Sequence, residues 1–105
     1  MVLESLYRGP VVKQRNKKVY RNNVMPEVHL RRLTVDEALP KLDKFLHDTF
    51  IAGLHQVRVV HGKGTGTLRQ VVRKHLNGHT LVKSYRTGIY GEGGIGVTIV
   101  ELSPK

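Results

Sequence analysis

The 105-residue sequence contains no cysteine and few acidic residues, and both shortages narrow what the protein can be. Without cysteine, a disulfide scaffold, a thiolate zinc site and a cysteine nucleophile are excluded. No apolar run approaches the roughly 18 residues that a membrane helix needs. The first residues, MVLESLYRG, lack the apolar stretch of a signal peptide. We therefore expect a cytoplasmic protein without a membrane partner.

Acidic residues number only 8 against 18 lysines and arginines, so the net charge is +10. An excess of this size usually marks a polyanionic partner such as nucleic acid, although basic residues also keep small domains in solution. The charge is densest in residues 1–26, which hold six Lys or Arg and one acid. We interpret this segment as a basic arm along a phosphate backbone or as a linker without a site of its own.

Residues 27–105 carry the patterns of a folded domain. Short apolar or β-branched runs predict four strands, at 27–33, 56–60, 81–86 and 97–102. Two segments with helical spacing lie between them. This order, β-α-β-α-β-β, predicts an α/β (α+β) fold in which two helices pack on a four-stranded mixed sheet.

Both predicted helices can be placed from local patterns. The first follows a capping box formed by Thr34 and Glu37. Pro40 lacks the N–H that a helix interior uses, so we expect a kink or a delayed helix start there. The second helix covers residues 68–76, and its apolar stripe places His75 on the face toward the core.

The strongest chemical signal is the sequence HGKGTG at residues 61–66, between a predicted strand and a predicted helix. Glycines let backbone N–H groups turn toward a ligand, and the start of a helix favours an anion. The spacing fits neither a Walker A loop nor a dinucleotide-binding motif. We interpret the segment as a phosphate-binding loop; the alternative is a tight turn that His61 pins by buried hydrogen bonds. The predicted phosphate-binding residues are Gly62, Lys63, Gly64, Thr65, Gly66, Arg32 and Arg69.

The first predicted strand offers a second candidate site. With Val28 and Leu30 facing one way, His29 and Arg31 face the other. They share a sheet edge with His61 if the first two strands are parallel. Two imidazoles and a guanidinium around one phosphate suit hydrolysis, because they move protons near neutral pH and offset developing charge. The alternative is an exposed edge strand with polar side chains.

The third candidate is the loop at residues 88–96, which has five glycines in nine positions. Such a loop can close over a substrate, with Tyr90 stacking on a base and Glu92 acting as acid, base or metal ligand. The alternative is a flexible connection between two strands.

Metal binding has little support in the sequence. The histidines outside the candidate sites show no pair at helix spacing with a partner carboxylate, so we predict no metal-binding residues. These histidines are His47, His55, His75 and His79. A divalent metal such as Mg²⁺ is left open as a cofactor without a clear ligand set. No Gly-x-Ser-x-Gly motif indicates a serine hydrolase.

Several of these segments, in this order, resemble the Smr (small MutS-related) domain, above all the version at the C-terminus of the second bacterial MutS family. The resemblance covers about three-quarters of the chain, and its motifs lie at 35–39, 42–46, 61–66 and 91–102. It implies a two-layer α/β sandwich and an endonuclease that nicks duplex or branched DNA with little sequence preference. Relatives are linked to DNA repair and suppression of recombination, and others cleave messenger RNA at stalled ribosomes.

The resemblance also implies a larger context and a set of site residues. Residues 27–105 would be the Smr-like domain of a longer, dimeric, bacterial MutS-like ATPase, and residues 1–26 its linker. The expected catalytic residues are His61, His29, Arg31 and Glu92. We expect an endonuclease domain; the alternative is a non-catalytic DNA-, RNA- or ribosome-binding module.

One family motif departs from the pattern in this sequence. The family has Leu-Asp-Leu-His/Arg-Gly at its first motif, and residues 28–32 read Val-His-Leu-Arg-Arg. The acid is thus replaced by His29 and the glycine by Arg32. If that acid binds metal or polarises water, cleavage is weak or absent. If it only orients another group, His29 can substitute for it. The departure favours binding over cleavage.

Overall fold

The computed structural model describes residues 25–64 and 66–104, so the predicted arm at 1–26 lies outside the described residues except for its last two positions. The strands and helices appear in the predicted order. They are β1 (Glu27–His29), α3 (Val35–Ile51), β2 (Gln56–Val60), α4 (Thr67–Leu76), β3 (Val82–Thr87), the 3-10 turn η2 (Gly94–Gly96) and β4 (Val97–Leu102). In the part of the chain that the structure describes, no helix is long and apolar enough to span a membrane.

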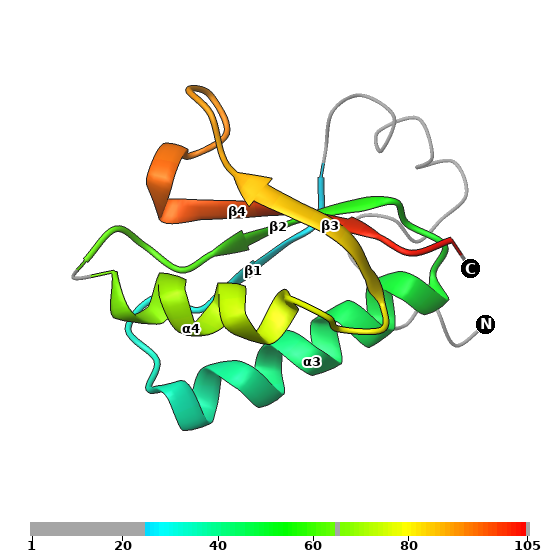
Figure 1. Cartoon of the computed structure of the whole chain (residues 1–105), viewed down its shortest axis with the longest axis horizontal. Helices are drawn as coiled ribbons and strands as arrows, with labels where there is room; N and C mark the ends of the chain where they lie inside the picture. The colour runs from blue at the N-terminus through cyan, green and yellow to red at the C-terminus, as the bar shows by residue number, and fades with distance from the viewer. Residues whose placement is uncertain (1–24, 65, 105) are drawn as a thin grey trace.

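The four strands form one sheet in the order β1-β2-β4-β3. β1 runs parallel to β2, whereas β4 runs antiparallel to both of its neighbours. Both helices lie against the same face of this sheet, which gives two layers (Figure 1). The predicted mixed sheet with two helices is therefore confirmed, including the parallel pairing of the first two strands.

The core fills the space between the sheet and the two helices. Val57 and Val59 of β2 and Val100 of β4 are fully buried, and Leu42 of α3 packs into the same cluster. Successive side chains of a strand point to opposite faces, so every second residue of β2 faces the helices. His61 follows Val59 by two positions, and this parity directs it toward the helix layer.

Helix α3 begins where the capping box predicts. Thr34 Oγ1 accepts from the Glu37 N–H at 3.2 Å, and Glu37 Oε1 accepts from the Thr34 N–H at 2.9 Å. The expected delayed start at Pro40 is wrong, because the helix starts at Val35 and continues through the proline. Pro40 leaves only the Asp36 carbonyl without its helical donor, and both residues are exposed, so water can replace that bond.

Candidate nucleic-acid interface

His61 lies on the buried side of the sheet and holds the turn that follows β2. Thr98 of β4 pairs with Val59, and His61 Nε2 lies 2.8 Å from Thr98 Oγ1. His61 Nδ1 lies 3.0 Å from the Gly62 carbonyl oxygen. A carbonyl only accepts, so Nδ1 carries the proton and Nε2 accepts from the Thr98 hydroxyl. Only 4% of the residue is exposed. This geometry fits the alternative in which His61 pins the turn.

The surroundings of His61 keep its imidazole neutral. Burial lowers the pKa of His61, the Gly62 carbonyl opposes this, and the charges of Arg73 and Arg69 lower it further. Arg73 donates to Thr87 Oγ1, while its Nε is buried without a hydrogen-bond partner. Among the described residues no carboxylate forms an ion pair with either arginine. Arg69 at the start of α4 and Arg73 in its last turn therefore lack a counter-ion among these residues.

Two hollows share the loop at residues 62–64 as a common wall. The inner hollow, about 370 Å³, lies on the helix side between the starts of α3 and α4 and is lined by Arg32, Lys63 and Arg69. The outer hollow, about 380 Å³, is lined by Arg31, Lys63 and glycines of the 88–96 loop. The predicted glycine loop thus separates two neighbouring cationic depressions.

The inner hollow combines three cations with the start of a helix. Gly66 is the N-cap of α4 at φ +90°, and no side chain caps this helix. A Cβ on Gly66 would lie 3.1 Å from Arg69 Nη2, so the guanidinium rests directly on the glycine. Positive φ favours glycine here. The start of the helix and three positive side chains make the inner hollow suitable for an anion. Thr65, also predicted to bind phosphate, lies outside the described residues.

The loop is already held in place from the outer side. The Gly96 carbonyl of η2 accepts from the N–H groups of His61 and Gly62, at 3.1 and 2.9 Å. Gly62 has φ +87°, and a Cβ there would lie 3.2 Å from Arg31 Cγ. Arg31 therefore packs on the loop, and a phosphate would meet a preformed surface.

The structure does not bring His29 and His61 together around one phosphate. His29 alternates with the buried Val28, so its side chain faces away from the helix layer that contains His61. It is 60% exposed, and its Nε2 lies 2.8 Å from Glu27 Oε2. Only Arg31, of these first-strand candidates, lines a hollow beside the glycine loop.

Glu92 supports the 88–96 loop through its own ion pair. Its two carboxylate oxygens accept from Arg86 Nη1 and Nη2 at 2.7 and 2.9 Å, and Oε1 also accepts from the Ile89 N–H at 2.9 Å. Arg86 first, and then the Ile89 N–H, lower the pKa of Glu92 to about 2. The carboxylate is therefore ionised and fully bonded at neutral pH.

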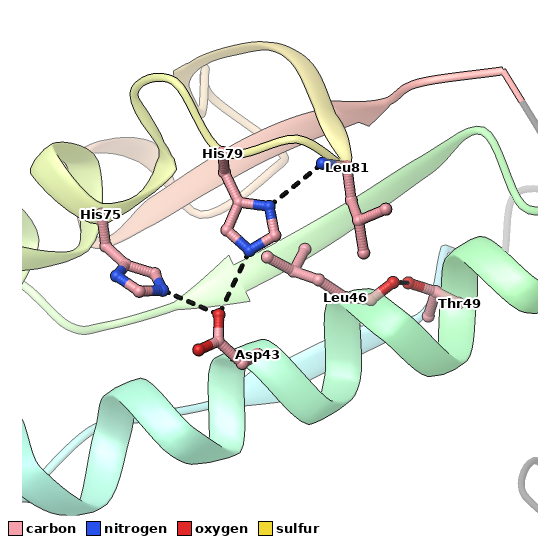
Figure 2. Close-up of polar contacts among 6 residues, drawn as sticks. All are labelled: Asp43, Leu46, Thr49, His75, His79 and Leu81. Atoms are coloured by element: carbon pink, nitrogen blue, oxygen red, sulfur yellow. Dashed lines mark hydrogen bonds and ion pairs between the residues drawn. The ribbon is translucent and has the colours of Figure 1, made fainter.

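A second histidine cluster lies at the far end of α4, and sequence reasoning missed it. Asp43 Oδ1 of α3 lies 2.7 Å from His75 Nε2 and 3.2 Å from His79 Nε2 (Figure 2). The expectation that His75 faces the core is wrong, because its side chain is 28% exposed and reaches Asp43. The expectation that these histidines lack a partner carboxylate is also wrong. No local pattern could reveal it, because Asp43 precedes them by 32 and 36 residues.

These three residues are the one cluster of the described chain whose ligand atoms, within 4.8 Å of one another, could hold a metal ion. Their hydrogen bonds favour a different role. The Leu81 N–H donates to His79 Nδ1 at 3.1 Å, so the proton of neutral His79 is on Nε2 and is donated to Asp43 (Figure 2). A metal ligand needs a lone pair on that same nitrogen. We name Asp43, His75 and His79 the Asp43 clasp, because they join α3 to the end of α4.

Comparisons with known proteins agree with this architecture. A family model of the Smr domain matches residues 28–103. The chain belongs to the Smr domain family. This Smr domain is 52% identical over 80 residues to Endonuclease MutS2 of Pelotomaculum thermopropionicum, which covers 76% of this chain and 10% of that protein. It is 57% identical over 77 residues to Endonuclease MutS2 of Symbiobacterium thermophilum, which covers 73% and 10%.

Solved structures show the same fold. The Smr domain of Thermus thermophilus MutS2 superimposes with a TM-score of 0.74 at 48% identity, covering 76% of this chain and 100% of that one. YdaL, a stand-alone small MutS-related protein from Escherichia coli, gives 0.71 at 27% identity, covering 78% and 70%. The Smr resemblance is thereby confirmed. The chain spans about a tenth of the length of the curated MutS2 relatives.

Within this Smr domain, the backbone explains one family preference. Arg32 occupies the position where the family's first motif has glycine, and its φ is +67°. It is the one non-glycine residue with positive φ in the described part of the chain. Left-handed backbone is costly for a residue with a Cβ. Arg32 adopts this costly backbone conformation, and its side chain adds a further cation to the lining of the inner hollow.

Proposed function

We propose that this Smr domain binds nucleic acid by holding a backbone phosphate in the inner hollow, as part of an endonuclease that nicks duplex or branched DNA with little sequence preference. The observation that carries the binding is that Arg32, Lys63 and Arg69 line a hollow at the start of α4. Cations and a helix N-terminus both favour a phosphate group. The name Endonuclease MutS2 of the relatives supports an endonuclease activity, and DNA as the substrate is part of the proposal.

Most of the predicted site residues have a role in this proposal. The loop that follows Gly62 contacts the phosphate, whereas the Gly62 N–H is already donated to the Gly96 carbonyl. His61 positions the loop, because both of its ring nitrogens are already bonded. Arg31 lines the outer hollow and is available for charge compensation. His29 pairs with Glu27 and lines neither hollow, so proton transfer at the held phosphate is not assigned to it. Glu92 supports the neighbouring 88–96 loop.

Binding is tested by fluorescence anisotropy with a labelled branched DNA over a range of salt concentrations. Lys63→Gln and Arg69→Gln are each expected to weaken binding several-fold and to reduce the log–log salt slope by about one, since each removes about one phosphate contact. Lys74→Gln is the matched control, because Lys74 is exposed on the same helix and lines neither hollow. Equal losses for all three variants would contradict a site in the inner hollow.

Cleavage is tested by nicking of supercoiled plasmid with Mg²⁺ and with EDTA. The wild type is expected to nick, and the EDTA sample reports whether a divalent metal is needed. Arg31→Gln is expected to reduce nicking strongly, because Arg31 lines the outer hollow beside the glycine loop. His29→Ala is expected to nick like the wild type, because His29 lines neither hollow, and a loss of nicking with retained binding would restore its predicted catalytic role. Equal nicking by wild type and His61→Ala would remove His61 from the mechanism.

A second candidate function is a non-catalytic DNA-, RNA- or ribosome-binding module. It is favoured by His29 at the position of the family's motif acid. Binding without nicking, with and without Mg²⁺, would establish it, and co-sedimentation with ribosomes would identify the ribosomal version.

The larger context is part of the proposal. Because the chain spans about a tenth of its MutS2 relatives, we place it in a longer bacterial MutS-like ATPase linked to DNA repair and suppression of recombination. Residues 1–26 would then be the linker to the rest of that protein. The bacterial cytoplasm, which contains the chromosome, is the proposed location.

A further inference from the structure

The 88–96 loop forms a braced turn. The Glu92 and Gly94 N–H groups both donate to the Ile89 carbonyl, at 2.8 and 3.3 Å. The Glu92 side chain closes the turn from the other side by accepting from the Ile89 N–H and from Arg86 of β3. The turn projects beyond the sheet on the side away from the helices (Figure 1). Its side chains are therefore presented from a fixed backbone.

This turn exposes three large apolar side chains. Tyr90 is 100% exposed, Ile89 61% and Ile95 53%. Val35 is the one other exposed large apolar residue among those described. Apolar groups gathered on one small, braced turn indicate a binding surface more than scattered ones do. Tyrosine in particular offers a flat ring with little conformational entropy to lose on binding.

The base of the turn is continuous with the glycine loop. Gly93 and Gly96 line the outer hollow together with Arg31 and Lys63. A Cβ on Gly96 would lie 3.2 Å from Lys63 Cγ, so the two loops touch. A nucleic acid that extends from the inner hollow across the glycine loop into the outer hollow therefore passes beside the apolar turn.

We infer that Tyr90, flanked by Ile89 and Ile95, is a stacking platform for one unstacked nucleobase of the bound nucleic acid. The inference rests on the proposed phosphate site and adds a substrate class to it. Every base has an apolar face that an aromatic ring can cover, so this contact is independent of sequence. It agrees with an endonuclease that has little sequence preference.

The platform distinguishes unpaired bases from bases in an intact duplex. Within an intact duplex both faces of each base are covered by its neighbours, and freeing a base costs unstacking and unpairing. Single-stranded segments, gaps and branch points offer such bases without that cost. The substrate class is therefore nucleic acid with an unpaired stretch next to the phosphate that the cationic loop holds.

The test compares binding of a blunt duplex and a gapped duplex of equal length, using the 105-residue chain. The gapped duplex has fewer phosphates, so charge alone would favour the blunt one. The gap carries 2-aminopurine, whose fluorescence falls when it stacks on an aromatic ring. The wild type is expected to prefer the gapped DNA about tenfold and to quench the probe. Tyr90→Ala should lose both effects, and Tyr90→Phe should keep them. Neither changes the charge, so the salt slope should stay constant.

The outcomes separate this inference from the proposed function. If Tyr90→Ala keeps the preference and the quenching while Lys63→Gln weakens binding, the phosphate site stands and the platform is refuted. If the wild type binds no nucleic acid, both fail. If Tyr90→Ala binds DNA like the wild type but abolishes self-association seen by analytical ultracentrifugation, the turn is a protein interface. Because Tyr90 is fully exposed, both variants are expected to fold.

Discussion

The two ends of helix α4 use histidine in opposite ways. At its start, His61 is buried and neutral, and nearby Arg69 and Arg73 help to keep its pKa low. At its end, the two histidines of the Asp43 clasp share one carboxylate. The clasp supplies its own counter-charge, whereas in the described chain no carboxylate forms an ion pair with Arg69 at the helix start or with Arg73 in the last turn. Positive charge without an internal partner marks the end that an external anion can occupy.

The largest expected effect comes from removing the buried histidine. His61→Ala should lower the free energy of unfolding by about 2–3 kcal/mol, because it opens a cavity and leaves the buried Thr98 hydroxyl without a partner. Urea denaturation measures this. His55→Ala is the matched control, since His55 is exposed, and it should stay within about 0.5 kcal/mol of the wild type. Equal losses would mean that His61 does not hold the turn.

Lowering the pH should weaken the histidine contacts at the two ends of α4 in different pH ranges. The pKa of His61 is lowered in the folded state, so below about 6.5 protons bind preferentially to the unfolded chain. The stabilisation that neutral His61 gives to the folded state is complete above pH 6.5, and it is lost as the pH falls through the pKa of His61 in the folded protein. The stability gap between wild type and His61→Ala should therefore narrow from pH 7.5 to pH 5, measured by urea denaturation. If the difference in unfolding free energy between wild type and His61→Ala grew on acidification, folding would raise the pKa of His61 and the prediction would be wrong.

The Asp43 clasp should respond only at lower pH. Burial raises the pKa of Asp43, but the hydrogen bonds from His75 and His79 outweigh it, so the folded value lies below 3.8. Asp43→Asn should cost about 1 kcal/mol or less near neutral pH, because this carboxylate is half exposed and water screens the pairs. The loss should disappear as the pH falls below about 4, since the wild-type carboxylate then takes up its proton.

Two comparisons sharpen the clasp prediction. Asp48→Asn breaks a surface pair with Lys44 and should cost less than Asp43→Asn. Zn²⁺ should leave the melting temperature of the wild type unchanged, because the Nε2 of His79 carries a proton. A rise in melting temperature that Asp43→Asn abolishes would show a metal site in place of the clasp.

The smallest expected effect concerns backbone strain at the inner hollow. Arg32→Gly should stabilise folding by up to about 1 kcal/mol, because glycine adopts φ +67° without penalty. It should also weaken DNA binding several-fold through the lost cation. Arg32→Lys keeps the charge and the strain, so it should change neither quantity appreciably. Thermal melts and anisotropy titrations distinguish the two contributions.

Much of the fold could be predicted because its signals are local. The strand at 56–60 and the strand at 97–102 match β2 and β4 at both ends, since β-branched runs bounded by turn residues leave little freedom. The capping box of Thr34 and Glu37 spans only four residues and is confirmed. The rule for Pro40 gave a wrong result, because it weighs one lost hydrogen bond and ignores the cap and the packing that fix α3.

The candidate site was less accessible from the sequence. The glycine loop was found, and the side to which His61 turns follows from counting two residues beyond the buried Val59. The Asp43 clasp has no such signal, because its partners meet only after α3 and α4 pack together. Helical periodicity placed His75 on the core face, yet a polar partner on the neighbouring helix holds it near the surface. Spacing within one helix does not reveal what another helix offers.

The position of β4 has a consequence for how the chain acquires its structure. β4 is the last strand in chain order, yet it lies between β2 and β3. During synthesis from the N-terminus, β2 and β3 therefore emerge before the strand that joins them, each with an open edge. A chain that ends before Val97 has no way to connect the two halves of its sheet. Cooperative folding of the complete sheet must therefore wait until β4 has been synthesised.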